Sequence, residues 1–117
     1  MPINLRSHGH GQGYVDLNFL IPELVEKVAY RKGPYFADTG DFSSAGSVAI
    51  DYVRDLPNGI ARVESGQFGY QRALYADGFT LGRGRKLVTA VETRLHDGPW
   101  DVDVNFRKIN AFARVSQ

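Results

Sequence analysis

Two histidines that flank one glycine are the first residues in this chain whose types could do chemistry. His8 and His10 could offer imidazole nitrogens to a zinc ion. The chain has no cysteine, and no carboxylate cluster lies near these histidines to complete a ligand set. His96 stands alone in the sequence. We therefore expect a polar loop at His8 and His10, with no metal site and no cofactor.

A run of aspartates and serines is the second candidate, because such residues can bind calcium or act as nucleophiles. Asp38, Asp41, Ser43 and Ser44 lack the order of an EF-hand loop and its terminal bidentate glutamate. The serines also lack the strand–Gly-x-Ser-x-Gly–helix setting of a nucleophile elbow. Asp and Ser in turns often bind their own backbone. We expect turns here, no catalytic residue, and a protein that is not an enzyme.

The most basic segment, residues 82–86 (GRGRK), could contact phosphate groups. It lies between two strand-like segments, and a solvated hairpin turn is the better explanation of its charges. The formal net charge of the whole chain is only +1, which gives no electrostatic case for nucleic acid. We expect a hairpin turn and no nucleic-acid partner.

Aromatic residues lie at the ends of several strand-like segments. Tyr70, Phe79 and Trp100 fit the aromatic girdles of membrane barrels, and they fit ordinary strand-end packing in a soluble sheet as well. Both interpretations stay open on these residues alone.

The elements that must position these residues begin after a polar, glycine-rich N-terminal loop. Pro22 suits the first position of a helix, and two glutamates nearby favour the positive end of its dipole. Apolar residues recur every fourth position from Leu20 to Val28. These signals predict a helix within residues 22–27 and a strand within residues 28–31. Gly33-Pro34 should end that strand, since proline cannot donate to a β-ladder.

The rest of the chain consists of strand-like segments separated by turn residues. The predicted strands are residues 47–53, 60–69, 70–79, 86–95 and 106–115. Apolar and charged residues alternate clearly in the last two, and poorly in the two segments before them. The last four segments are about ten residues long, the length of a tilted membrane strand. Their short connections predict an antiparallel meander, so the fold class is mainly β.

Two parts of the sequence resemble TonB-dependent outer-membrane receptors. LRSHGHGQGYVDLNFLIPELVEKVAYRKGPYFADTGDFSSAGS is similar to the latter half of their plug domain. Lys32-Gly33-Pro34 stands where the family usually has Arg-Gly-Pro. ARVESGQFGYQRALYADG and KLVTAVETRLHDGPWDVDVNFRKINAFARV are similar to the first barrel strands.

The resemblance implies a partial plug domain, residues 1–57, with a short helix and strands. Residues 58–117 would be about four strands of an incomplete antiparallel transmembrane β-barrel. In such receptors a periplasmic TonB energy-coupling protein pulls on the plug, and a scarce ligand passes through a barrel of about 22 strands. The ligand would be a siderophore or other metal chelate, cobalamin, haem or a carbohydrate. The resemblance places the chain in the cell outer membrane of a Gram-negative bacterium, in contact with its lipid.

By the same resemblance, Arg6 and Lys32 occupy positions where basic plug residues face acidic groups on the barrel wall, and Gly33-Pro34 belongs to the plug motif. Lys32 departs from the usual arginine and would act as a point charge rather than as a two-pronged donor. The first 14 residues contain no apolar signal-peptide segment, and the coupling box, the first half of the plug and most barrel strands are missing. We therefore expect a fragment of a longer polypeptide that transports nothing alone.

A small soluble all-β module that binds sugar or protein on an open sheet face is the alternative. The dependence of the purified chain on detergent, and the DNA upstream of Met1, would separate the two interpretations.

Overall fold

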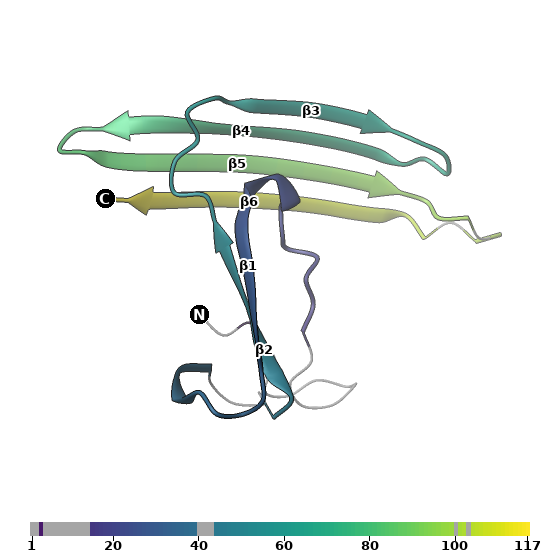
Figure 1. The fold of residues 1–117 in the computed structure, drawn as a ribbon. Coiled ribbons are helices and arrows are strands. Elements are labelled where there is room, and N and C mark those ends of the chain that lie inside the picture. Colours follow the sequence, from purple (N-terminus) through teal and green to yellow (C-terminus); the bar gives the residue numbers. More distant parts are fainter. Residues whose placement is uncertain (1–2, 4–14, 40–43, 100, 103) are drawn as a thin grey trace. The chain divides into compact units, whose positions relative to one another are not determined.

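The residues that the structure describes form two antiparallel β-sheets, which confirms the expected mainly-β fold class (Figure 1). The structure is a computed structural model that describes residue 3 and residues 15–39, 44–99, 101–102 and 104–117. It divides into two compact units, Met1–Tyr52 and Val53–Gln117, and each sheet belongs to one of them.

The first unit is built on a two-stranded sheet. Its elements are the 3-10 turn η1 (Pro22–Leu24), strand β1 (Val25–Lys32), the 3-10 turn η2 (Ala37–Thr39) and strand β2 (Gly46–Tyr52). The backbone N–H of Ile21 donates to the Tyr52 hydroxyl at 3.0 Å, which ties the start of η1 to the end of β2. Ile21 and Leu24 are almost fully buried, at 1% and 0% exposure.

The helix expected over residues 22–27 is wrong beyond Leu24. Pro22 does begin a helical turn, and the N–H of Val25 donates to the Pro22 carbonyl. Val25 itself is already extended and pairs with Tyr52 of β2. A four-residue spacing is an even number, so it also places apolar side chains on one face of a strand. Pairing with β2 therefore decides between helix and strand where the periodicity alone could not.

The strand predicted within residues 28–31 is confirmed as part of β1, and so is the break at Gly33-Pro34. Gly33 has a φ of +83°, in the left-handed region that favours glycine. A Cβ atom at this position would also collide with the Tyr35 ring. The exposed Tyr35 ring can turn away, so the positive φ angle is the main reason that this turn favours glycine at residue 33.

The second unit is the predicted antiparallel meander, with its strands side by side in chain order (Figure 1). The strands are β3 (Ile60–Ser65), β4 (Gln71–Leu81), β5 (Arg85–His96) and β6 (Phe106–Ser116). Turns near Gly69 and at residues 82–84 connect the first three, as expected. Among the described residues the sheet is open, with β3 and β6 as its two edges.

Strand β3 is shorter than the predicted segment 60–69. The chain turns after Ser65, where the N–H of Gly66 donates to the Tyr70 carbonyl at 2.9 Å. Phe68 and Gly69 adopt positive φ angles of 58° and 69°, which no continuing strand could accommodate. Strand β4 consequently begins at residue 71.

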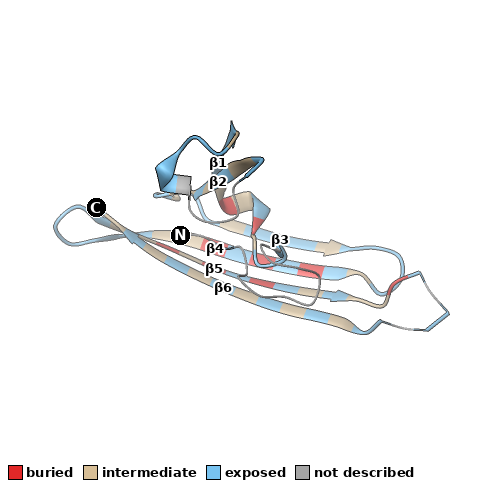
Figure 2. Cartoon of the chain, turned by 90° about the horizontal axis from the view of Figure 1, so that it is seen from below, coloured by how far each residue is buried: buried red, intermediate tan, exposed pale blue. Residues whose placement is uncertain are grey.

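Burial in this sheet alternates along the strands, so that one face is covered and the other is exposed (Figure 2). The buried strand residues are Arg72, Leu74, Ala76, Val88, Ala90 and Glu92. The strand pairing places all six on the same face, because directly paired residues point to the same side of a sheet.

Candidate functional site

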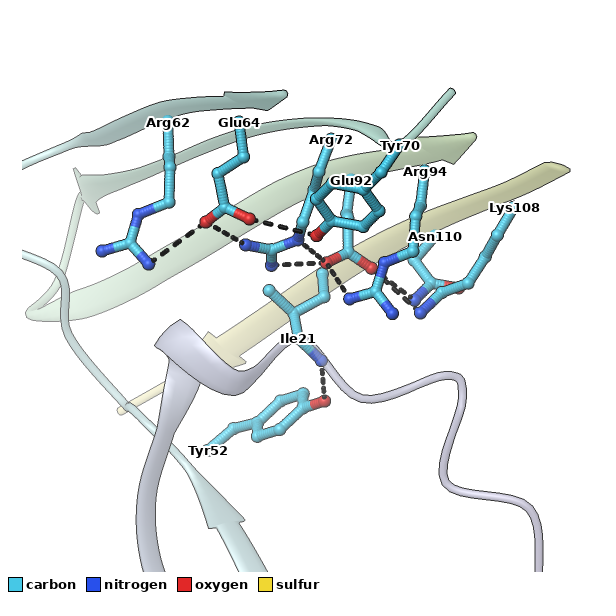
Figure 3. Close-up of polar contacts among 10 residues, drawn as sticks. All are labelled: Ile21, Tyr52, Arg62, Glu64, Tyr70, Arg72, Glu92, Arg94, Lys108 and Asn110. Atoms are coloured by element: carbon cyan, nitrogen blue, oxygen red, sulfur yellow. Dashed lines mark hydrogen bonds and ion pairs between the residues drawn. The ribbon is translucent and has the colours of Figure 1, made fainter. Parts of the chain in front are cut away.

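The covered face of the β3–β6 sheet carries a group of charged residues around one glutamate. This Glu92 cluster consists of Arg62, Glu64, Tyr70, Arg72, Glu92, Arg94, Lys108 and Asn110 (Figure 3). The antiparallel register brings its members together from all four strands and from the turn before β4. It is a site that only the folded sheet creates.

Glu92 is the centre of the cluster and is completely buried. Its Oε2 atom accepts from Arg72, whose Nε and Nη2 lie 2.7 and 2.5 Å away. Its Oε1 atom lies 3.1 Å from the Lys108 ammonium and accepts from the Asn110 amide at 3.2 Å. Each oxygen therefore has two donors, and short charge-assisted bonds of this kind are roughly twice as strong as neutral ones.

Glu64 extends the cluster toward the edge strand β3. Its Oε1 atom lies 3.4 Å from Arg72 Nη1, and its Oε2 atom accepts from the Tyr70 hydroxyl at 3.1 Å. Burial and the hydrogen bond to Glu64 raise the pKa of Tyr70 above its ordinary value. The phenol thus stays protonated and remains a donor at neutral pH. The Tyr70 ring also meets His96 edge to face, with centroids 6.2 Å apart.

The chemistry of this cluster is electrostatic. The four donors around Glu92 occupy its carboxylate, and Glu64 is held by Arg72 and by the Tyr70 hydroxyl. Among the described residues, no group of three or more His, Asp and Glu side chains is arranged to hold a metal ion. An arrangement of this kind can hold a sheet in register or recognise an opposite charge.

The opposite face of the sheet is mostly apolar and exposed, and its charged strand residues are Asp77, Arg85 and Arg107. Its exposed apolar residues are Val63, Tyr75, Phe79, Leu81, Val91, Leu95, Ile109 and Val115. The pairing joins them into one surface, with Val63 beside Ala73, Thr93 and Ile109 across the four strands. Val63 and Ile109 are 85% and 77% exposed. We call this surface the apolar face.

The residues singled out by resemblance lie in the first unit or outside the described residues. Lys32 is the last residue of β1, is exposed and pairs with Gly46. Gly33 and Pro34 form the turn that follows it. Arg6 lies outside the described residues. The assignment of Arg6 and Lys32 to contacts between plug and barrel therefore stays a prediction.

The other chemistry candidates are not brought together by the fold. Asp38 pairs with Arg31 at 3.0 Å in an exposed ion pair, and Arg31 also lies over the Phe36 ring. His96 ends β5 and touches Tyr70. Residues 82–84 form the predicted hairpin turn between β4 and β5. His8, His10, Asp41 and Ser43 lie outside the described residues.

Sequence reasoning missed the Glu92 cluster. The alternation in residues 86–95 does place Glu92 and Arg94 on one face, opposite Val91 and Leu95. Nothing in that pattern says which face is covered. The signal that could have found the cluster is the meander itself, since its register aligns Arg72 and Lys108 beside those two residues.

No family model, curated protein or solved structure gave a significant match to this chain. In the part of the chain that the structure describes, no helix is long and apolar enough to cross a membrane.

Proposed function

We propose that this chain is part of a TonB-dependent outer-membrane receptor for energy-coupled uptake of a scarce ligand. Residues 1–57 would belong to the plug and residues 58–117 to the first strands of the barrel wall. The role is binding and transport, without chemistry of its own. Lipid would cover the apolar face, and a periplasmic TonB protein would act on the complete receptor.

The observation that carries this proposal is the polarity of the β3–β6 sheet. A soluble sheet buries its apolar face and leaves charged residues in water. Here the buried face carries the ion pair of Glu92 and Arg72 beside four apolar residues, Leu74, Ala76, Val88 and Ala90, while Val91 and Ile109 on the other face are exposed. Strands of membrane barrels alternate in this inverted way, with apolar residues toward lipid and polar residues toward the interior.

The lengths of the strands support the same interpretation. Strands β4, β5 and β6 contain 11, 12 and 11 residues. A tilted strand needs about 9–11 residues to cross the hydrocarbon layer, whereas strands in soluble proteins average about five or six. These three strands are therefore long enough to cross a bilayer.

Site-directed spin labelling tests the membrane placement directly, because the natural chain has no cysteine. Single variants Ile109→Cys, Ala111→Cys and Phe112→Cys are labelled and reconstituted in lipid vesicles. Labels at residues 109 and 111 should collide with oxygen dissolved in lipid and be shielded from a water-soluble nickel chelate. The label at residue 112, on the charged face, is the matched control and should lack this oxygen preference.

The behaviour of the purified chain in detergent-free buffer is a second test of the membrane placement. Because two sheet edges and the apolar face would be open to water, we expect aggregation. A sharp monomer peak in size-exclusion chromatography, together with cooperative thermal unfolding and full nickel access at residues 109 and 111, would contradict the proposal. The alternative of a small soluble binding module would then stand.

Uptake itself can be tested in a chimera. Residues 1–117 replace the corresponding segment of a TonB-dependent receptor, and TonB-driven uptake of its labelled ligand is measured in whole cells. We expect uptake to survive with the natural segment and to fail with Val91→Arg, which places a charge on the apolar face. Loss of uptake by a correctly inserted natural chimera would argue against the receptor role.

A further inference from the structure

One row of paired residues crosses the charged face of the sheet at the Glu92 cluster. Glu64 pairs with Arg72, Arg72 with Arg94, and Arg94 with Lys108. Three cations thus lie next to one another on β4, β5 and β6. Like charges placed directly opposite across strands are destabilising unless something compensates them.

Glu92, in the adjacent row, forms close contacts with the two outer cations but only a longer ion pair with Arg94. A carboxylate offers about four lone-pair sites, and Arg72, Lys108 and Asn110 already supply four donors to Glu92. The Nη2 atom of Arg94 lies 3.9 Å from Glu92 Oε2, which is too far for a hydrogen bond. Arg94 is thus the cation of the row whose contact with Glu92 is longest.

The Nε atom of Arg94 shows the same deficit more directly. It is buried and has no hydrogen-bond partner among the described residues. Buried donors in folded proteins are nearly always paired, so an unpaired one calls for an explanation. The Arg94 side chain as a whole is 30% exposed, so that part of it can be reached from solvent.

The charges on this face favour an anion as the missing partner. The basic residues on it are Arg62, Arg72, Lys86, Arg94, Lys108 and Arg114, and the acidic ones are Glu64 and Glu92. The face therefore carries an excess of cations, even though Lys86 is paired with Asp55 and the whole chain has a net charge of only +1. A guanidinium offers Nε and Nη donors in a planar fork that matches the oxygens of a carboxylate or phosphate.

We propose that Arg94 is an anion-binding position, and that the ligand handled by this face carries a carboxylate or phosphate group. The second half of this inference rests on the proposed function, because only a transport role makes the face part of a ligand path. The first half, binding of an oxyanion at Arg94, stands on the geometry of the sheet alone.

NMR titration of the full chain tests the inference at the atom concerned. The ¹⁵N-labelled chain is prepared in octyl glucoside micelles, which carry no charged group, and is titrated with sodium phosphate and separately with sodium citrate. Ionic strength is held constant with sodium chloride. We expect a saturable shift of the Arg94 Nε–H resonance with at least one probe. Arg94→Lys assigns that resonance by its loss and should weaken binding about tenfold, since lysine lacks the fork.

The exposed hairpin residue Arg83 supplies the matched control. Arg83→Gln should leave the titration of Arg94 unchanged, because residue 83 lies at the tip of the β4–β5 turn. A linear, unsaturable shift shared by Arg83 and Arg94, or no shift at Arg94, would overturn the inference. A preference for phosphate or citrate indicates which oxyanion the site takes.

This outcome is independent of the spin-label result. Saturable binding without lipid-facing labels at residues 109 and 111 would keep the anion site and remove the receptor role. Lipid-facing labels without saturable binding would do the reverse. If Arg94→Lys disturbs the fold, triple-resonance experiments on the natural chain assign the Nε–H group, and its titration decides the question.

Discussion

The two faces of the β3–β6 sheet differ in the types of their side chains and in how far those side chains are buried. One face holds Glu92 and Arg72, both buried, in a network of ion pairs. The other holds Val91 and Ile109, both exposed. The hydrophobic effect in water accounts for the apolar residues buried beside Glu92, but not for large apolar side chains left exposed opposite a buried charge network. The contrast is explained if lipid is the solvent of the apolar face, and each substitution below breaks or sharpens it.

Removing the charge at the centre of the covered face should have the largest effect. Glu92→Gln leaves Arg72 and Lys108 without the carboxylate that neutralises them, and breaking a buried ion pair costs about 3–5 kcal/mol. Urea unfolding of the chain in detergent micelles should show a destabilisation of this order. Glu64→Gln, at a partly exposed carboxylate on the edge strand, is the matched variant and should cost clearly less. Equal losses would mean that Glu92 is not the centre of the network.

A charge on the apolar face should have the next largest effect. Val91→Arg should lower the stability of the vesicle-inserted chain by roughly 2–4 kcal/mol if residue 91 lies near the middle of the bilayer. In a soluble sheet the same exposed substitution would change stability by less than about 0.5 kcal/mol. The fraction of chain that floats with vesicles on a density gradient measures the difference, with Val91→Ala as the uncharged control. Unchanged flotation of the arginine variant would contradict a lipid-covered face.

Much of the strand layout could be predicted from the sequence, because glycine and proline punctuate it. Gly33-Pro34 and residues 82–84 mark turns that the structure confirms. The start of β1 could not be predicted, since a spacing of four residues suits both a helix and a strand and only pairing with β2 decides. The end of β3 was missed for a related reason, because the turn at Phe68 and Gly69 depends on local backbone geometry.

The Glu92 cluster was beyond sequence reasoning for a different reason. Burial alternates strictly in β4 from Gln71 to Ala76, yet the covered side chains there are an arginine, a leucine and an alanine. The polar and apolar residues of this strand therefore do not alternate in a way that would indicate its buried face. Which face is covered depends on the surroundings of the sheet, and the residue types of a single strand do not carry that information.

A substitution that makes the exposed face more apolar should have a smaller effect on stability. Thr93 lies on the apolar face, where it pairs with Ala73 and Ile109. Thr93→Leu should stabilise the vesicle-inserted chain by about 1 kcal/mol, because it adds buried CH₂ groups in lipid. Urea unfolding from vesicles is the measurement. In a soluble module the same change would instead promote aggregation, so a gain in detergent-free solubility would count against the membrane interpretation.

The ion pair between Arg31 and Asp38, which lies outside the β3–β6 sheet, should give the smallest effect. Arg31 and Asp38 are joined at 3.0 Å, but their side chains are 50% and 70% exposed. Water and salt screen such a pair, so Asp38→Asn should cost only about 0.2–1 kcal/mol and less at high salt. Urea unfolding at low and high sodium chloride, compared with Glu92→Gln under identical conditions, measures the contrast. If both substitutions cost the same and respond equally to salt, burial of the Glu92 cluster is not what makes it strong.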